Sequence, residues 1–261
     1  MEVTPKLNYS SQPFGVDVSR YQGRIDWDQM TNGPIKVRFA GIRLGVSWGY
    51  VDPWFPHNWA ESSRMGCPRG AYHVFYPGEA IKPQVDLIAR TLGSDLGDLP
   101  VVPDIELAHG LGPSKIQPAV REYVFRIRDL IKRTPIIYSR TEWWNTNVTG
   151  MGDPPDWYAE LYWWLALYLK TSFPHPGPLT APRGVPADRV LIHQVSDHTP
   201  SLGFGISQAD SKQLDYDRWL KSEAELLSLA NKPAPVQDPV AIHTHENEIA
   251  KLNEVIAALG G

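Results

Sequence analysis

The sequence contains a single cysteine, Cys67, among its 261 residues. No internal disulfide can form, so the fold does not depend on an oxidising compartment. A lone cysteine in a globular chain is usually a buried, unreactive thiol. We expect this state for Cys67, rather than a nucleophile activated by the nearby His73.

Long apolar runs and a strong charge of one sign are also missing. No stretch approaches the roughly 18 apolar residues of a membrane span, so none is predicted. Residues 1–13 show no basic start followed by an apolar segment; we expect a polar arm, no signal peptide and synthesis in the cytoplasm. The net charge of −4 provides no basic surface, so neither nucleic acid nor an anionic membrane is an expected partner.

Proline and aromatic residues, in contrast, are abundant, with 24 Pro, 10 Trp and 11 Tyr. Many prolines predict many fixed loops. Trp and Tyr offer flat amphipathic faces that suit sugar rings or protein partners, although a large aromatic core is the simpler explanation for most of them.

Short apolar runs alternate with helical patterns along the chain. The runs predict strands at 14–18, 39–44, 70–75, 99–105, 135–138, 164–168 and 190–195. Helices are expected at 26–32, 57–66, 80–92, 114–132 and 141–147. This alternation is typical of βα units around a parallel sheet. The predicted fold class is therefore α/β, an irregular TIM-like β/α barrel over residues 14–230, with an open doubly wound sheet as the second choice. No glycine-rich phosphate-binding motif follows a strand, which disfavours a dinucleotide-binding fold.

Local signals refine the ends of these elements. Asp26 is a candidate N-cap for helix 26–32. Ser114 and Gln117 have the spacing of a capping box at the start of helix 114–132. That helix carries a stripe of apolar residues at helical spacing, formed by Ile116, Val120, Val124, Ile127 and Ile131.

The C-terminal part of the chain differs in amino-acid composition from the predicted barrel. Residues 171–189 are rich in Pro and Gly and predict a long loop, and residues 231–239 predict a linker. Residues 240–261 follow with a heptad-like apolar pattern shorter than three repeats, which predicts a C-terminal helix. This helix would pack against the barrel, mediate self-association or attachment to a virion partner, or form a loose tail.

The strongest chemical signal is an acidic pair at the end of an apolar strand. Asp104 and Glu106 close the run at 99–105, and residues two apart on a strand share a face. Active sites of parallel β/α barrels lie at this end of the strands. Two close carboxyl groups can divide the roles of proton donor and anion, as glycosidases require. A solvated strand end or a helix cap is the alternative explanation for a lone pair of this kind.

Two further acidic positions lie at predicted strand ends. Asp17 interrupts the apolar run at 14–18, so it must be hydrogen-bonded or functional. Asp215 and Asp217 lie in KQLDYDRW, where a last strand gives way to a last helix, and helix capping is their simplest structural role.

Taken in order, these segments resemble the family 25 glycoside hydrolases, the lysozymes of the Chalaropsis type. The resemblance covers residues 14–220 and rests on seven short motifs: GVDVS at 15–19, GAYHVFY at 70–76, the pair Asp104 and Glu106, IYS at 137–139, WLALY at 164–168, HQVS at 193–196 and LDYD at 214–217. Two positions depart from the family pattern, since His193 stands where Trp is usual and Asp217 where Asn is frequent.

The resemblance implies hydrolysis of the β-1,4 bond between N-acetylmuramic acid and N-acetylglucosamine in peptidoglycan, by a retaining, substrate-assisted mechanism without a cofactor or metal. Glu106 is implied as the general acid, Asp104 as the group that orients the substrate N-acetyl group, and Asp17 and Asp215 as the rest of the acidic cluster. Candidate substrate-binding residues are His73, Phe75, Tyr138, Trp164, Tyr168 and Gln194.

Other functions are less consistent with the sequence. A chitinase-type site has further aspartates upstream on the same strand, where this chain has Val101 and Leu99. The sequence contains no H-E-x-x-H motif, the pattern that would predict a metallohydrolase. A catalytically silent barrel that binds glycan or assembles into a virion is the alternative from another class. The missing signal peptide favours a bacteriophage product that acts on the host cell wall, either as a lysis enzyme or attached to the virion.

Overall fold

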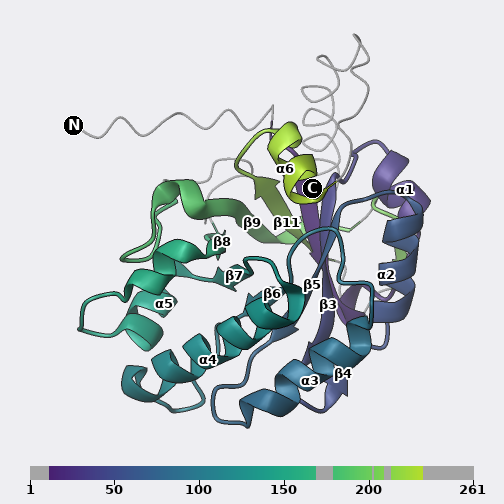
Figure 1. Ribbon diagram of the computed structural model, residues 1–261. Helices are drawn as coiled ribbons and strands as arrows, with labels where there is room; N and C mark the ends of the chain where they lie inside the picture. Colours follow the sequence, from purple (N-terminus) through teal and green to yellow (C-terminus); the bar gives the residue numbers. More distant parts are fainter. Residues whose placement is uncertain (1–11, 169–178, 202, 209–212, 232–261) are drawn as a thin grey trace, which may run out of the picture.

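Eight strands of the described residues close into a barrel (Figure 1). A computed structural model describes residues 12–168, 179–201, 203–208 and 213–231. The barrel strands are β1 (Phe14–Val18), β3 (Phe39–Val46), β5 (Arg69–Val74), β6 (Val102–Asp104), β7 (Ile136–Ser139), β8 (Tyr162–Ala166), β9 (Val190–Pro200) and β11 (Gln213–Trp219). They follow the order β1-β11-β9-β8-β7-β6-β5-β3, and pairing of β1 with β3 completes the ring. The predicted irregular β/α barrel is confirmed.

The irregularity comes from the last strand. β11 pairs antiparallel with both β1 and β9, whereas the neighbouring strands around the rest of the ring are parallel. The sequence pattern placed these residues at a transition into a helix, with capping as the simplest role of their aspartates. That interpretation is wrong, because Asp215 and Asp217 lie inside β11. Three short strands were also not predicted: β2 (Arg24–Ile25), β4 (Tyr50–Val51) and β10 (Ile206–Gln208).

Helices cover the outside of the barrel (Figure 1). They are α1 (Trp27–Asn32), α2 (Phe55–Arg64), α3 (Ile81–Leu92), α4 (Pro113–Ile131), α5 (Thr141–Trp144) and α6 (Glu223–Leu229). Asp26 caps α1 as predicted, accepting hydrogen bonds from the backbone amides of Asp28 and Gln29. The capping box predicted at Ser114 is wrong: α4 begins earlier, with Gly112 as its N-cap and Pro113 in the first turn, a position where proline is favourable.

Shorter helical segments connect these elements. A π-helical turn, Asn145–Thr149, continues α5, and together they correspond to the helix predicted at 141–147. Single 3-10 turns occur at Arg20–Gln22, Asp156–Glu160 and Ala187–Arg189, the last within the predicted loop at 171–189.

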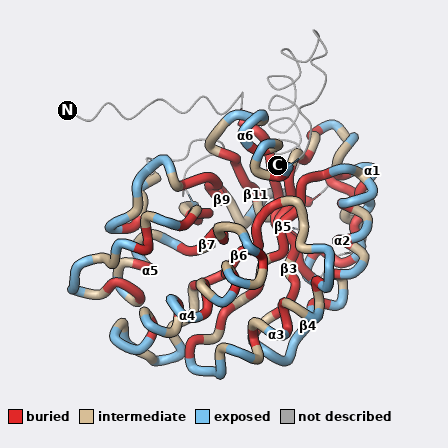
Figure 2. The backbone as a smooth tube through the Cα atoms, in the orientation of Figure 1, coloured by how far each residue is buried: buried red, intermediate tan, exposed pale blue. Residues whose placement is uncertain are grey.

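Strand alternation divides the apolar side chains into two clusters. Outward residues such as Ile42 and Ile137 share one cluster with the apolar stripe of α4, and the five residues predicted for that stripe are all buried. Inward residues, among them Phe39, Ile136 and Trp219, form a second cluster. Figure 2 shows the strands as the buried centre, with exposed backbone on the surrounding helices and loops. Cys67 is buried, as expected.

One glycine makes room for an inward indole. A Cβ atom on Gly41 would lie 2.5 Å from Cη2 of Trp164 and 3.2 Å from Cβ of Asp17. Since real Cβ atoms do not approach carbon this closely, only glycine permits β3 to pass Trp164 here.

Several predictions concern residues outside the described part of the chain. These are most of the arm at 1–13, most of the linker at 231–239 and the C-terminal helix at 240–261. Across the ranges that are described, no helix combines the length and apolar character needed to cross a membrane.

Candidate active site

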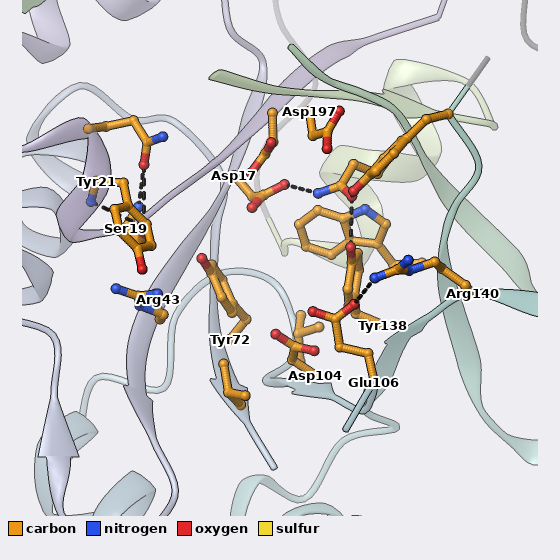
Figure 3. Close-up of a pocket in the computed structure, with 17 residues that line it drawn as sticks. Asp17, Ser19, Tyr21, Arg43, Tyr72, Asp104, Glu106, Tyr138, Arg140 and Asp197 are labelled. Atoms are coloured by element: carbon orange, nitrogen blue, oxygen red, sulfur yellow. Dashed lines mark hydrogen bonds and ion pairs between the residues drawn. The ribbon is translucent and has the colours of Figure 1, made fainter. Parts of the chain in front are cut away.

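A pocket of about 490 Å³ is surrounded by the ends of the barrel strands (Figure 3). Its wall includes the four predicted acids, Asp17, Asp104, Glu106 and Asp215. Four of the predicted substrate-binding residues also line it: Tyr138, Trp164, Tyr168 and Gln194. Side chains from distant parts of the sequence therefore converge on one space.

Barrel closure brings the first and last acids together. Asp17 on β1 is the antiparallel partner of Asp215 on β11, so both side chains point to the same face. Asp217, two residues further along β11, is fully buried and accepts a 2.9 Å hydrogen bond from Nε1 of Trp164. Three aspartates thus lie at one side of the barrel interior.

Asp104 and Glu106 stand on the opposite part of the wall. Asp104 is the last residue of β6, in register with Val74 on β5 and Tyr138 on β7, and is only 6% exposed. Glu106 follows the strand end, with a side chain that is 26% exposed, and pairs with Arg140 through a 2.9 Å contact to Nη2. One carboxyl group is therefore enclosed by protein while the other faces the open pocket.

Gln194 connects the acids to the aromatic wall. Its Nε2 donates a hydrogen bond to Oδ2 of Asp17 at 2.5 Å. Its Oε1 accepts from the hydroxyl groups of Tyr138 at 2.7 Å and Tyr168 at 2.5 Å. Since both amide atoms are engaged, the amide orientation is fixed, and it holds the two phenol rings toward Asp17.

Burial raises the pKa values of the four aspartates described above, Asp17, Asp104, Asp215 and Asp217. Burial, and next the carboxylate of Asp217, raises the pKa of Asp17 well above its ordinary value. The pKa of Asp104 is raised by burial and then by Glu106, while the positive charges of Arg43 and Arg140 oppose this shift. Burial and the neighbouring Asp17 raise the pKa of Asp215 to about 9. Asp215 therefore retains its proton at neutral pH.

One acceptor atom in the pocket lacks a partner. Oδ1 of Asp104 is buried and receives no hydrogen bond from any residue in the described ranges. A buried, unpaired carboxyl oxygen is unfavourable by about 1–3 kcal/mol or more. A ligand N–H or O–H group at this position would remove that penalty.

His73 and Phe75, also predicted to bind substrate, do not line this pocket. Tyr72 and Val74 of the same segment face the pocket, so the alternation of β5 turns His73 toward the helices. There its Nδ1 bonds the hydroxyl group of Tyr123 at 2.6 Å and its Nε2 bonds the carbonyl oxygen of Ser47 at 2.7 Å. Phe75 stacks on Tyr123 with a centroid distance of 4.3 Å. Both predictions are corrected to structural roles.

Other pocket residues were not anticipated. They are Ser19, Tyr21, Gln22, Arg43, Tyr72, Val74, Val102, Arg140 and Asp197. Tyr72 belongs to the same motif as His73, and only knowledge of which strand face is inward would have selected it. Arg43 and Arg140 belong to no motif considered in the sequence, although both lie at or near the ends of predicted strands and Arg140 directly follows the IYS motif.

The His, Cys, Asp and Glu side chains of the described residues do not form a metal centre. Within the described ranges, no group of three or more His, Cys, Asp or Glu side chains has a geometry that could hold a metal ion. The acids instead contact the amide of Gln194, the indole of Trp164 and the guanidinium group of Arg140.

Comparison with known proteins assigns this arrangement to a family. The family model described as Glycosyl hydrolases family 25 matches residues 16–199. Among solved structures, the bacterial lysozyme from Streptomyces coelicolor superposes with a TM-score of 0.67 and 26% sequence identity, covering 85% of this chain and 98% of that one.

Two curated relatives align by sequence. The uncharacterized protein YegX of Escherichia coli strain K12 is 34% identical over 159 residues, which are 60% of this chain and 56% of YegX. The chain thus spans little more than half the length of that relative. Lysozyme M1 of Streptomyces globisporus is 28% identical over 233 residues, covering 84% of this chain and 72% of that protein.

Proposed function

The chain belongs to glycosyl hydrolases family 25, and on that premise we propose that it hydrolyses peptidoglycan at the β-1,4 bond between N-acetylmuramic acid and N-acetylglucosamine. The observation that carries the proposal is the convergence of Asp17, Asp104, Glu106 and Asp215 on one pocket. The relatives named lysozymes support the same substrate.

Glu106 is the general acid in this proposal. Its carboxyl group is open to the pocket, so it can donate a proton to the glycosidic oxygen as the bond to the leaving sugar breaks. In the second step, the same group accepts a proton from the attacking water, which returns it to the starting state.

Asp104 orients the nucleophile, the N-acetyl group of the substrate. In a substrate-assisted reaction, the acetamide oxygen attacks the anomeric carbon while its N–H group becomes more acidic. The unpaired, buried Oδ1 of Asp104 supports this role, because it is an acceptor without a donor in the described protein. A hydrogen bond from the acetamide N–H would hold the oxygen toward the anomeric carbon and stabilise the developing positive charge.

Asp17 and Asp215 keep this wall acidic without contacting the bond that breaks. Their raised pKa values allow the pair to share a proton, and Gln194 fixes Asp17 in place. Tyr138, Tyr168 and Trp164 form the adjacent wall, where aromatic faces can contact sugar rings.

The test is cleavage of purified peptidoglycan by the wild type and by Glu106→Gln, with new reducing ends identified by mass spectrometry. We expect muramic-acid reducing ends from the wild type and a loss of roughly two or more orders of magnitude in the variant. Glu122→Gln, on the exposed side of α4, is the matched control and should retain activity. No cleavage by the wild type would favour the silent glycan-binding barrel.

The biological setting stays the prediction made from the sequence: a bacteriophage lysis enzyme, or a protein attached to the virion through residues 240–261. That segment lies outside the described residues. A barrel retained only for assembly would not need the acidic cluster, which favours the catalytic proposal.

A further inference from the structure

Carboxyl groups outnumber arginines around the pocket. Five carboxyl groups line it, from Asp17, Asp104, Glu106, Asp197 and Asp215. The cations of the same lining are Arg43 and Arg140, on opposite sides of the pocket (Figure 3). Because carboxyl groups offer no positive charge whether or not they are protonated, a substrate carboxylate would need one of these two arginines as its partner.

Arg43 is already committed to another carboxylate. Its Nε contacts Oδ2 of Asp52 at 2.8 Å, and the two side chains are 11% and 1% exposed. The ring of Tyr21 lies 5.3 Å from the guanidinium carbon. Enclosed between a buried anion and an aromatic ring, this guanidinium is fixed and largely neutralised.

Arg140 differs from Arg43 in its exposure to solvent and in its ionic partner. Its side chain is 55% exposed, and its charge-assisted contact is the 2.9 Å pair with Glu106. It follows β7 and precedes α5, directly beside the proposed general acid. An exposed arginine of this kind can change partners at small energetic cost.

The pairing with Glu106 is incompatible with the catalytic step. A general acid must carry its proton when the glycosidic bond breaks, and a neutral carboxyl group no longer forms an ion pair. Arg140 then needs another anion. N-acetylmuramic acid supplies one next to the scissile bond, since its lactyl ether ends in a carboxyl group that is either free or extended by a peptide.

We propose that Arg140 binds a carboxylate of the substrate, exchanging its pairing with Glu106 for this contact when the glycan enters the pocket. The exchange makes Arg140 a specificity determinant for carboxylate-bearing glycan and leaves Glu106 free to act on the glycosidic oxygen. This inference rests on the proposed function. The carboxylate comes from the lactyl group in peptide-free glycan, or from the stem peptide where one is attached.

The experiment compares matched substrates with matched variants. Glycan strands stripped of peptide expose the lactyl carboxylate, and conversion to the methylamide removes that charge with little change in shape. Peptide-bearing glycan is treated in the same way to neutralise its peptide carboxylates. Values of kcat/KM are measured on all four substrates for the wild type, Arg140→Gln and Arg140→Lys, with Arg126→Gln on the exposed side of α4 as the control.

We expect the wild type and Arg126→Gln to prefer a charged substrate over its methylamide by about tenfold, the effect of one charge-assisted hydrogen bond. Arg140→Gln should lose the preference, and Arg140→Lys should keep part of it. A preference confined to stripped glycan assigns the lactyl carboxylate, and one confined to peptide-bearing glycan assigns the peptide.

Two results would overturn the inference while leaving the proposed function intact. One is equal cleavage of charged and neutral substrates by the wild type. The other is an equal loss of activity on both forms in Arg140→Gln, which would mean that Arg140 only positions Glu106. If the wild type cleaves none of the four substrates, the proposed function fails as well.

Discussion

Replacing Asp215 by asparagine should stabilise the protein at neutral pH. Burial and the adjacent Asp17 raise the pKa of Asp215 to about 9, whereas an aspartate in the unfolded chain titrates near pKa 3.9, about the ordinary value. Between these values, the folded state keeps a proton that the unfolded state has released. Stability is therefore unaffected below about pH 4 and falls as the pH rises toward 9.

The size of the effect follows from the same shift. A difference of one bound proton changes the free energy of unfolding by about 1.4 kcal/mol per pH unit. From pH 4 to pH 7, Asp215 thus lowers stability by up to about 4 kcal/mol. Because the cluster shares its protons, this value is an upper bound. Asparagine removes the titration, so the melting temperature at pH 7 should rise by as much as on the order of 10 °C.

This prediction is tested by thermal and urea unfolding of the wild type and Asp215→Asn at pH 4, 5.5, 7 and 8.5. The variant should match the wild type at pH 4 and gain stability at each higher pH, while its activity falls. Asp153→Asn, in an exposed loop, is the control and should show no such trend. A stability difference that is independent of pH, or a variant that is less stable at pH 7, would refute the electrostatic reasoning.

Two further predictions concern packing around the site. Gly41→Ala places a methyl group against the indole of Trp164, so we expect a loss of about 1–3 kcal/mol in urea unfolding and a changed Trp fluorescence; an unchanged spectrum and stability would contradict the close packing. Tyr123→Phe removes the hydrogen bond to Nδ1 of buried His73, whose pKa burial lowers to about 4 and which is neutral at pH 7. Stability should drop by about 1–3 kcal/mol with peptidoglycan cleavage retained, and a selective loss of cleavage would return His73 to the substrate site.

Much of the barrel could be predicted because its parallel strands are apolar on both faces. The strand predicted at 14–18 has the same first and last residues as β1. The apolar stripe of α4 is buried, as its spacing indicates. β11 escaped prediction for a physical reason. Its inward positions hold Asp215 and Asp217, so carboxyl groups occupy places where a strand normally has apolar side chains. Local pattern cannot distinguish such a strand from a capped helix start.

The site residues also divide into those that local sequence pattern predicts and those that only the fold reveals. Motifs identified the acids, since a carboxylate at the end of an apolar strand is conspicuous in any sequence. The choice between the two faces of β5 was not determined, because Ala71, Tyr72, His73 and Val74 are compatible with burial in either direction. Arg140 acquires its importance only from contact with Glu106, which depends on the pairing of β6 with β7.

Because the antiparallel strand β11 closes the barrel, the site can form only after β11 has been synthesised. During synthesis, Asp17, Asp104 and Glu106 leave the ribosome long before Asp215, and β1 has no β11 partner until residues 213–219 have emerged. A chain that stops before this point would have an unpaired edge on β1 and an incomplete acidic wall. If the proposed activity holds, the nascent chain should remain inactive until its last strand has been translated, and premature termination should yield inert products rather than partially active ones.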